Sequence, residues 1–151
     1  MRGEKNNMAN YTDFEKLQKL PDNKFIDETN YVDAALKSFA YFDDSRYKNK
    51  KITSSKLRSL YSMLCDIIKD ENDKTGTQIS SGCSAALKLL KIRIIYDMGR
   101  DESVKIFIEN TNLIAYLVHV EKNKKRDDFK LYCKYFEALV AFHRYLNPKE
   151  N

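Results

Sequence analysis

The sequence is poor in the residues that build turns and edges. Its 151 residues include four glycines, two prolines and no tryptophan, too few Gly and Pro for a turn-rich sandwich or barrel. Long apolar runs are also missing: the longest, 113–118, has six residues and is too short to cross a bilayer. No amino-terminal stretch has the pattern of a secretory signal. We therefore expect a cytoplasmic protein without membrane contact.

Cysteine and histidine are scarce as well. The three cysteines, Cys65, Cys83 and Cys133, are odd in number and widely spaced, so we expect reduced, mostly buried thiols. The two histidines, His119 and His143, fall in different predicted helices, and neither has a partner at metal-binding spacing. This pattern predicts no metal site.

Catalytic motifs are absent from the sequence. It contains no phosphate-binding loop, no G-x-G-x-x-G, no G-x-S-x-G and no H-E-x-x-H. No pair of acids has helical spacing in an apolar setting, as general acid–base chemistry would need. We therefore predict a protein that is not an enzyme and that has no cofactor and no small-molecule substrate.

The residues that are present favour an all-α fold. Apolar residues make up 42% and charged residues 32%, which is typical of a globular domain. Apolar positions repeat at three- and four-residue spacing along most of the chain. We predict a compact bundle of about five helices, with residues 30–151 as a single domain. Residues 1–29 are polar apart from Phe14, Leu17 and Leu20, and predict a flexible arm that docks weakly at most.

The expected helices follow from this periodicity. The fourth is interrupted near residue 111, and the second begins at a capping residue, Thr53 or Ser54. The third is apolar around most of its circumference, which predicts the central helix of the bundle. The acidic loop 70–82, which includes Glu71, is interpreted as solvated surface. The predicted ranges are 31–42, 52–64 with an apolar face reaching Ile68, 83–98, 104–122 and 129–146.

A corner between two helices, residues 91–107, organises the rest of the chain. Gly99 lies where a helix would end in a left-handed conformation, and Asp101 and Glu102 follow in the first turn of the next helix. Arg93 and Arg100 flank this corner, where two planar, permanently charged groups would suit phosphate oxygens. Two alternatives stay open for these arginines: a structural role inside the fold, or the binding of phosphate.

In the first alternative, Arg93 pairs with an internal carboxylate, for which Glu137 is the candidate because it lies in an apolar neighbourhood. A buried carboxylate needs such a partner. Arg100 would then only cap a helix.

Charge is unevenly distributed. The formal net charge is +5 and the pI about 9.0, which favours an acidic partner such as nucleic acid. Two stretches, 46–65 and 77–96, contain no acidic residue. We expect them to lie side by side and to form, with Arg100, one continuous basic face that binds RNA phosphate and ribose; the alternative is a solvated face. The candidate RNA-binding residues are Lys50, Lys51, Lys56, Arg58, Lys91, Arg93 and Arg100.

Three segments, taken together, carry a family resemblance. They are the helix start I-T-S-S-K-L-R at 52–58, the corner R-I-I-Y-D-M-G-R at 93–100 and the ending F-E-A-L-V-A at 136–141. In this order they resemble the small helical subunit of the type III-A CRISPR effector, the Csm complex, over roughly residues 50–146. Residues 1–29 carry no resemblance.

The resemblance implies a compact bundle of about five helices with no catalytic activity of its own. Copies of such a subunit stack head to tail against the guide (CRISPR) RNA and its target RNA and contact backbone rather than bases. Other subunits of the effector complex hold the nucleases and the cyclic-oligonucleotide synthase. Lys51, Lys56 and Arg58 match the basic start of the family's first conserved helix, and Arg93 and Arg100 match its corner. The rival hypothesis is a helical protein–protein adaptor whose basic face only aids solubility.

Overall fold

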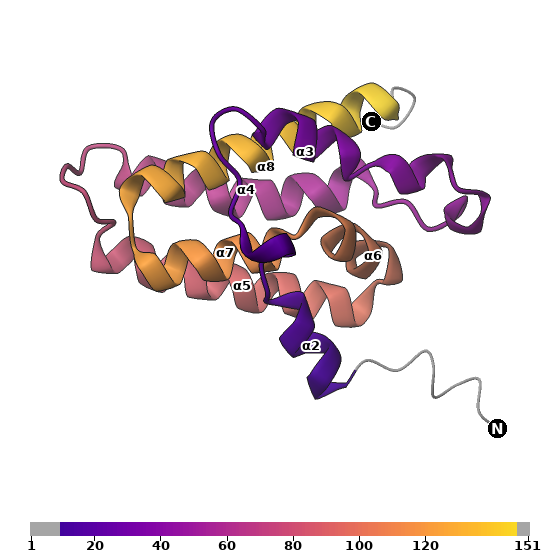
Figure 1. Ribbon diagram of the computed structural model, residues 1–151, viewed down its shortest axis with the longest axis horizontal. Coiled ribbons are helices and arrows are strands. Elements are labelled where there is room, and N and C mark those ends of the chain that lie inside the picture. Colours follow the sequence, from indigo (N-terminus) through magenta and orange to yellow (C-terminus); the bar gives the residue numbers. More distant parts are fainter. Residues whose placement is uncertain (1–9, 148–151) are drawn as a thin grey trace.

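A computed structural model describes residues 10–147, and this part of the chain is all-α (Figure 1). Its only β-type pairing in that range is an isolated bridge between Gln78 and Lys125. None of the described helices is long and apolar enough to span a membrane. The α-helices are α2 (Tyr11–Leu17), α3 (Tyr31–Lys37), α4 (Ser54–Glu71), α5 (Ser81–Arg100), α6 (Glu102–Thr111), α7 (Leu113–Asn123) and α8 (Arg126–Leu146). Short 3-10 turns occur at η1 (Pro21–Asn23), η2 (Ala40–Asp43) and η3 (Ser45–Tyr47).

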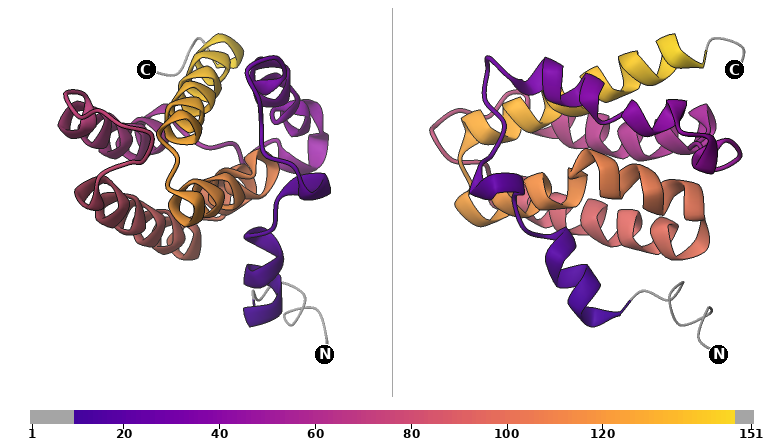
Figure 2. Two further views of the ribbon diagram at one scale, coloured as in Figure 1. Left: turned by 60° about the vertical axis from the view of Figure 1, so that its left-hand side comes forward. Right: turned by 45° about the vertical axis from the view of Figure 1, so that its right-hand side comes forward.

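The three long helices form the frame of the bundle. Helix α4 packs against both α5 and α8, and α7 fills the space between α5 and α8. Helix α3 lies along the outer side of α8, whereas α5 forms the opposite side of the molecule (Figures 1 and 2). The predicted central helix 83–98 is therefore a surface helix, and this expectation was wrong.

The core follows the helical period of the sequence. On α4 the side chains of Leu57, Leu60 and Leu64 are at most 1% exposed, because they recur on the face turned to α5 and α8. Burying one such leucine contributes about 1.5–3 kcal/mol. On α8 the buried tyrosines Tyr132 and Tyr135 donate their hydroxyl hydrogens to the carbonyls of Leu113 and Thr111, so their polar atoms are satisfied.

The described part of the chain has seven α-helices, more than the five or so expected. One extra helix arises at Asn112, whose φ of 59° is left-handed and ends α6 before α7 begins. Asparagine tolerates this conformation better than most residues. The predicted interruption near residue 111 is thus confirmed.

The segment before α3 adds the other extra helix. Asn10 caps α2 by accepting a hydrogen bond from the Asp13 amide at 2.9 Å. Further along, Ile26 is only 5% exposed, and the Phe25 ring stacks on His119 with centroids 4.2 Å apart. Phe25 and Ile26 are therefore docked on the bundle, whereas α2 has no buried residue. The flexible arm over residues 1–29 stays a prediction. Residues 1–9 lie outside the described residues, and the domain boundary at residue 30 stays a prediction.

Gly99 does not end its helix. Helix α5 continues through it to Arg100, and Gly76, with φ of 104°, is the described glycine with a left-handed conformation. The turn is made instead at Asp101, whose extended backbone ends α5 and whose carboxylate accepts hydrogen bonds from the Ser103 amide and hydroxyl. The cap prediction for Gly99 was therefore wrong, whereas Thr53 caps α4 as expected.

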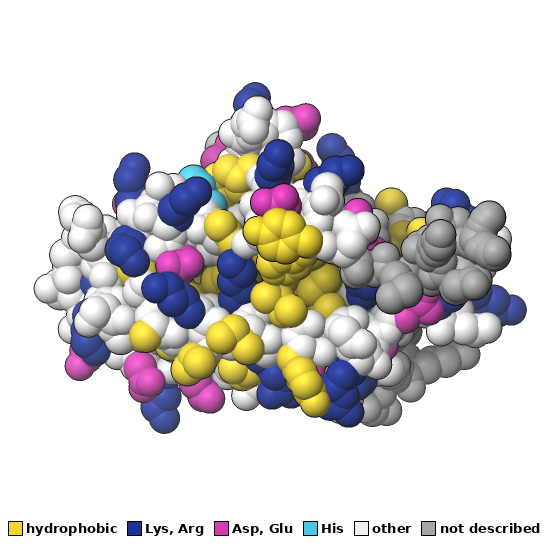
Figure 3. Space-filling view, turned by 90° about the horizontal axis from the view of Figure 1, so that it is seen from below, with side chains coloured by type: hydrophobic (Ala, Val, Ile, Leu, Met, Phe, Trp, Pro, Cys, Tyr) yellow, Lys and Arg dark blue, Asp and Glu magenta, His cyan; other side chains and the backbone are white. Residues whose placement is uncertain are grey.

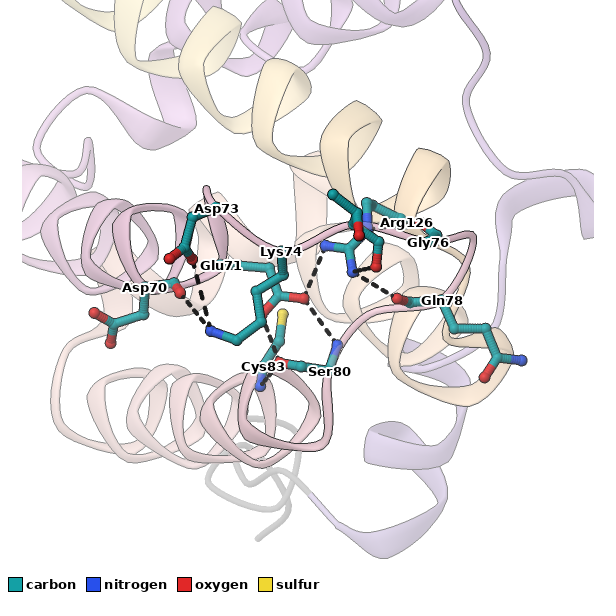
Figure 4. A network of polar contacts seen from close by, with 10 residues as sticks. Asp70, Glu71, Asp73, Lys74, Gly76, Gln78, Ser80, Cys83 and Arg126 are labelled. Atoms are coloured by element: carbon teal, nitrogen blue, oxygen red, sulfur yellow. Dashed lines mark hydrogen bonds and ion pairs between the residues drawn. The ribbon is translucent and has the colours of Figure 1, made fainter.

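At the opposite end of α4 a buried ion pair fixes the 72–80 loop. Arg126 Nη1 lies 2.8 Å from Glu71 Oε2, with side chains only 9% and 5% exposed (Figure 4). The Ser80 amide donates to the same carboxylate at 2.8 Å. The guanidinium also donates to three loop carbonyls, those of Thr75, Gly76 and Gln78. We call the Glu71–Arg126 pair, with Ser80 and these carbonyls, the loop clasp.

Burial alone would raise the pKa of Glu71, but the hydrogen bonds from Ser80 and the Arg126 guanidinium outweigh it, so the pKa is lowered. Glu71 is thus not part of a solvated surface, as predicted from its acidic neighbours. The helical periodicity could have predicted the burial of Glu71, because this residue follows Leu64 and Ile67 on the buried face of α4.

The free cysteines are partly as expected. Cys83 is buried, and its pKa is raised to about 12 by that burial, so the thiol stays protonated at neutral pH. Cys65 and Cys133 are half-buried.

Candidate nucleic-acid interface

The two acid-free stretches meet in the fold as predicted. Helix α4, which carries most of the first stretch, packs along α5, which carries most of the second (Figure 1). At this contact Arg93 Nη2 donates to Ser59 Oγ at 3.2 Å. The basic start of α4 consequently lies near the end of α5.

Carboxylates from outside the two stretches neutralise part of this charge. Lys56 pairs with Asp101 at 3.2 Å and Lys50 with Glu102 at 3.5 Å, both at the start of α6. We call this region the corner cluster; its members are Lys50, Lys56, Arg93, Arg100, Asp97, Asp101 and Glu102. Four cations and three anions leave it with a net charge of +1.

Arg93 has a different acidic partner from the one predicted. Its Nε lies 3.1 Å from Asp97 Oδ2, one helical turn further along α5. Glu137 is exposed on α8 and needs no buried partner. The predicted Arg93–Glu137 pair was wrong because α8 turns Glu137 to solvent and buries Phe136 beside it.

Two of the predicted arginines, Arg58 and Arg100, are exposed. Arg100 stacks on Tyr96, its Cζ 5.4 Å from the ring centroid. Arg58 lies three residues before Tyr61, on the flank of α4 where Tyr61 contacts Phe136 of α8. Within residues 10–147 neither arginine forms a salt bridge, so both guanidiniums can accept an external anion.

The remaining two lysines are partly occupied by the protein. Lys51 lies over the Phe42 ring at 5.0 Å, a cation–π contact. Lys91 donates to Gln18 Oε1 at 2.9 Å, on the flank of α5 that faces α2 rather than α4. The structure therefore places four of the seven candidates in the corner cluster and the other three, Lys51, Arg58 and Lys91, outside it. A single continuous basic face stays a prediction.

The corner cluster is partly open to solvent. A hydrogen bond from Ser103 lowers the pKa of Asp101, burial opposes this and Lys56 adds to the lowering. The side chains of Lys56 and Arg93 are 44% and 43% exposed, and those of their partners Asp101 and Asp97 are 25% and 15% exposed. Exposed ion pairs of this kind contribute only about 0–1 kcal/mol, so a phosphate could exchange with a carboxylate at small cost.

A feature that the sequence reasoning missed lies beside this cluster. Leu89, Ile92 and Tyr96 are 63%, 61% and 59% exposed and follow one another along the outer face of α5. Figure 3 shows a row of hydrophobic side chains on one face of the molecule, with lysine, arginine and acidic side chains next to it. We call Leu89, Ile92 and Tyr96 the α5 stripe. Their i, i+3, i+7 spacing indicates a second apolar face on this helix, but the apolar circumference predicted from sequence was interpreted as that of a buried central helix.

Comparison with known proteins gives a consistent family. The family model described as Csm2 Type III-A matches residues 30–149. A protein of Enterococcus italicus named CRISPR system Cms protein Csm2 is 34% identical over 94 residues, covering 62% of this chain and 67% of the relative. Proteins of the same name from Streptococcus thermophilus and Mycobacterium tuberculosis (strain ATCC 25618 / H37Rv) are 25% and 28% identical over 125 and 100 residues. These matches cover 83% and 66% of this chain, and 98% and 79% of the relatives.

Proposed function

The chain belongs to the Csm2 type III-A family, and on that premise we propose that it is a non-catalytic small subunit of a type III-A CRISPR RNA-guided interference complex. The match over residues 30–149 is the observation that carries the proposal, because it spans α3 to α8 and with them the whole helical frame. The relatives bear the name CRISPR system Cms protein Csm2, which supports the same role. The subunit acts in the cytoplasm.

In this role the protein binds the backbone of guide RNA and target RNA without reading sequence. Three observations support the proposal: a net charge of +5, the exposed guanidiniums of Arg58 and Arg100, and exposed ion pairs that a phosphate can replace. Contacts to phosphate and ribose suit a subunit that must serve any guide sequence. Its other partners are the remaining subunits of the complex and stacked copies of itself.

One copy offers only a few cations to RNA. Its affinity alone should therefore be about micromolar or weaker at physiological salt. Copies that stack on one RNA raise the joint affinity through effective concentration, without any new contact between protein and RNA.

A helical protein–protein adaptor is the second candidate function. The specific observation in its favour is the neutralisation of Lys50, Lys56 and Arg93 by nearby carboxylates, which leaves the corner cluster at a net charge of +1. An adaptor predicts no RNA binding at low salt, whereas the proposed subunit predicts a clear salt dependence.

Filter binding of the full chain to two unrelated single-stranded RNAs at several salt concentrations tests the proposal. For the wild type we expect log affinity to fall with log salt by about 0.7 per phosphate contacted, equally for both RNAs. The variant Arg58→Glu/Arg100→Glu should weaken binding to both RNAs alike and flatten the slope, since it reverses the two exposed guanidiniums.

A charge-matched control is Lys122→Glu/Lys130→Glu, which changes the net charge equally on exposed positions of α7 and α8. It should bind RNA more tightly than the arginine variant. Equal losses in both variants would assign the effect to net charge alone, and no RNA binding by the wild type would favour the adaptor. Co-purification of the tagged chain with a guide-RNA-containing ribonucleoprotein tests the complex itself.

A further inference from the structure

The α5 stripe is an apolar surface that the fold does not cover. Leu89, Ile92 and Tyr96 are each about 60% exposed, whereas Leu87, Leu90 and Ile94 of the same helix are buried. Apolar side chains gathered into one row, rather than scattered singly, mark an interaction surface. The partner of this surface must tolerate or match the charge around it.

Basic side chains border the α5 stripe, and two of them are in ion pairs, Lys88 with Glu121 and Arg93 with Asp97. Helix α5 carries four basic residues and one acid, and the basic residues lie on both flanks of the row. Lys88 lies on the flank that reaches Glu121 of α7, and Arg93 on the flank that reaches Ser59 of α4. Arg100 stacks on the last residue of the stripe. The surface therefore fits a partner with apolar side chains in an acidic setting.

The same chain presents such a surface on its opposite side. On α3, Val32 and Leu36 are 45% and 50% exposed, and the exposed carboxylate of Asp33 lies on the same face. Residues 27–44 contain five acids and a single lysine. We call Val32, Asp33 and Leu36 the α3 face.

The positions of the two surfaces determine whether copies of the chain would associate as a line or as a closed pair. Helix α3 lies on the outer side of α8, and α5 lies across the bundle from it in every view (Figures 1 and 2). A contact between two different surfaces on opposite sides of a molecule adds copies in a line, whereas a self-complementary patch closes into a pair. Pairing of α5 with α5 would also bring Arg93 and Arg100 of the two copies together, which like-charge repulsion opposes.

We propose that the α5 stripe of one copy docks on the α3 face of a second copy of this chain. The proposal deepens the proposed function, because it names the two surfaces through which copies would stack, and it rests on that function only for the role of RNA. Asp33 would then face the basic border of the α5 stripe. Each surface offers only two or three exposed apolar side chains, so the contact is weak in free solution and strengthens on a shared RNA.

Sedimentation velocity of the full chain over a concentration series tests the contact without RNA. The variants Leu89→Ser/Ile92→Ser and Val32→Ser/Leu36→Ser each remove one surface at exposed positions and leave the net charge unchanged. We expect either variant to weaken self-association by about tenfold or more. Asp33→Lys, at an exposed position, should weaken it as well and reduce its salt dependence.

Mixing the two serine variants gives the sharpest test. Each variant keeps the surface that the other has lost, so the equimolar mixture should form a one-to-one dimer that grows no further. Continued association of either variant alone would overturn the proposal, as would a mixture that stays monomeric. Association of the wild type through α5 alone would show as loss in the α5 variant but not in the α3 variant, and would also overturn it.

Binding measurements on short and long RNA test this docking proposal separately from the proposed function. On an RNA long enough for only one copy, both serine variants should bind like the wild type; on a long RNA they should lose cooperativity. A wild type that self-associates but binds neither RNA contradicts the proposed function and leaves the docking intact. A wild type that binds RNA, with serine variants that stay fully cooperative, contradicts the docking alone.

Discussion

The two ends of helix α4 hold their charges in opposite ways. At its carboxyl end the loop clasp buries Glu71 and Arg126, with side chains 5% and 9% exposed, among hydrogen bonds that satisfy both. At its amino end the corner cluster holds Lys56 and Asp101 at 44% and 25% exposure. Both ends carry ion pairs, but only one of them is closed to solvent.

This difference separates structure from binding. A buried pair cannot lose one partner cheaply, because the other charge would remain stranded in a region of low polarity. An exposed pair contributes little and is screened by salt, so its cations remain available to another anion. The loop clasp therefore holds the fold, and the corner cluster is the end at which we propose that phosphate binds.

Removing the guanidinium of the loop clasp should have the largest effect. Arg126→Ala strands the Glu71 carboxylate and leaves three loop carbonyls without their donor, which should cost about 3–5 kcal/mol of unfolding free energy. Urea denaturation followed by circular dichroism measures this loss. The double variant Glu71→Met/Arg126→Met should be more stable than Arg126→Ala, because no charge is stranded; an equally unstable double variant would contradict the argument.

Acid should weaken the loop clasp next. The pKa of Glu71 is lower in the folded chain than in the unfolded one, so its contribution is complete above the ordinary glutamate pKa of about 4.3. It is lost as the pH falls through the lowered value. We expect Glu71→Gln to be less stable than the wild type at pH 7 and to have a shallower acid limb. Denaturant midpoints between pH 7 and pH 3 measure it, and parallel limbs in both proteins would contradict it.

At the corner, Gly99→Ala should change stability in the favourable direction. Gly99 is helical, and a Cβ atom there would meet no heavy atom within 4 Å. Alanine should therefore stabilise the helix by about 0.5–1 kcal/mol, measurable as a higher melting temperature. Gly76→Ala is the contrasting control, since its φ of 104° makes any side chain unfavourable. A destabilised Gly99→Ala would restore the view of Gly99 as a helix cap.

The smallest effect is expected for the exposed pair of Arg93. Arg93→Ala removes an i, i+4 contact with Asp97, and such pairs contribute only about 0.3–0.5 kcal/mol. Glu137→Ala, which removes the partner predicted from sequence, should leave stability unchanged within error. A loss of several kcal/mol in Arg93→Ala would contradict the exposed assignment and blur the difference between the two ends of α4.

The periodicity and composition of the sequence by themselves determined the helical class and several helix boundaries. The helical class, the cap at Thr53 and the interruption near residue 111 each depend on neighbours within one or two turns. Such local preferences are written into consecutive residues, so a pattern can predict them. The family segments at 52–58, 93–100 and 136–141 are likewise continuous in the chain, and they pointed to the family that residues 30–149 match.

Only the tertiary structure determined which charged side chains pair with each other. Glu71 and Arg126 are 55 positions apart, and only the packing of α4 beside α8 brings them within 2.8 Å. In the same way the turn at Asp101 returns α6 to the start of α4, where its carboxylate meets Lys56. Electrostatic interactions act through space and depend on burial. An acid-free stretch of sequence therefore predicts a basic segment, but the fold decides whether that segment becomes a basic surface.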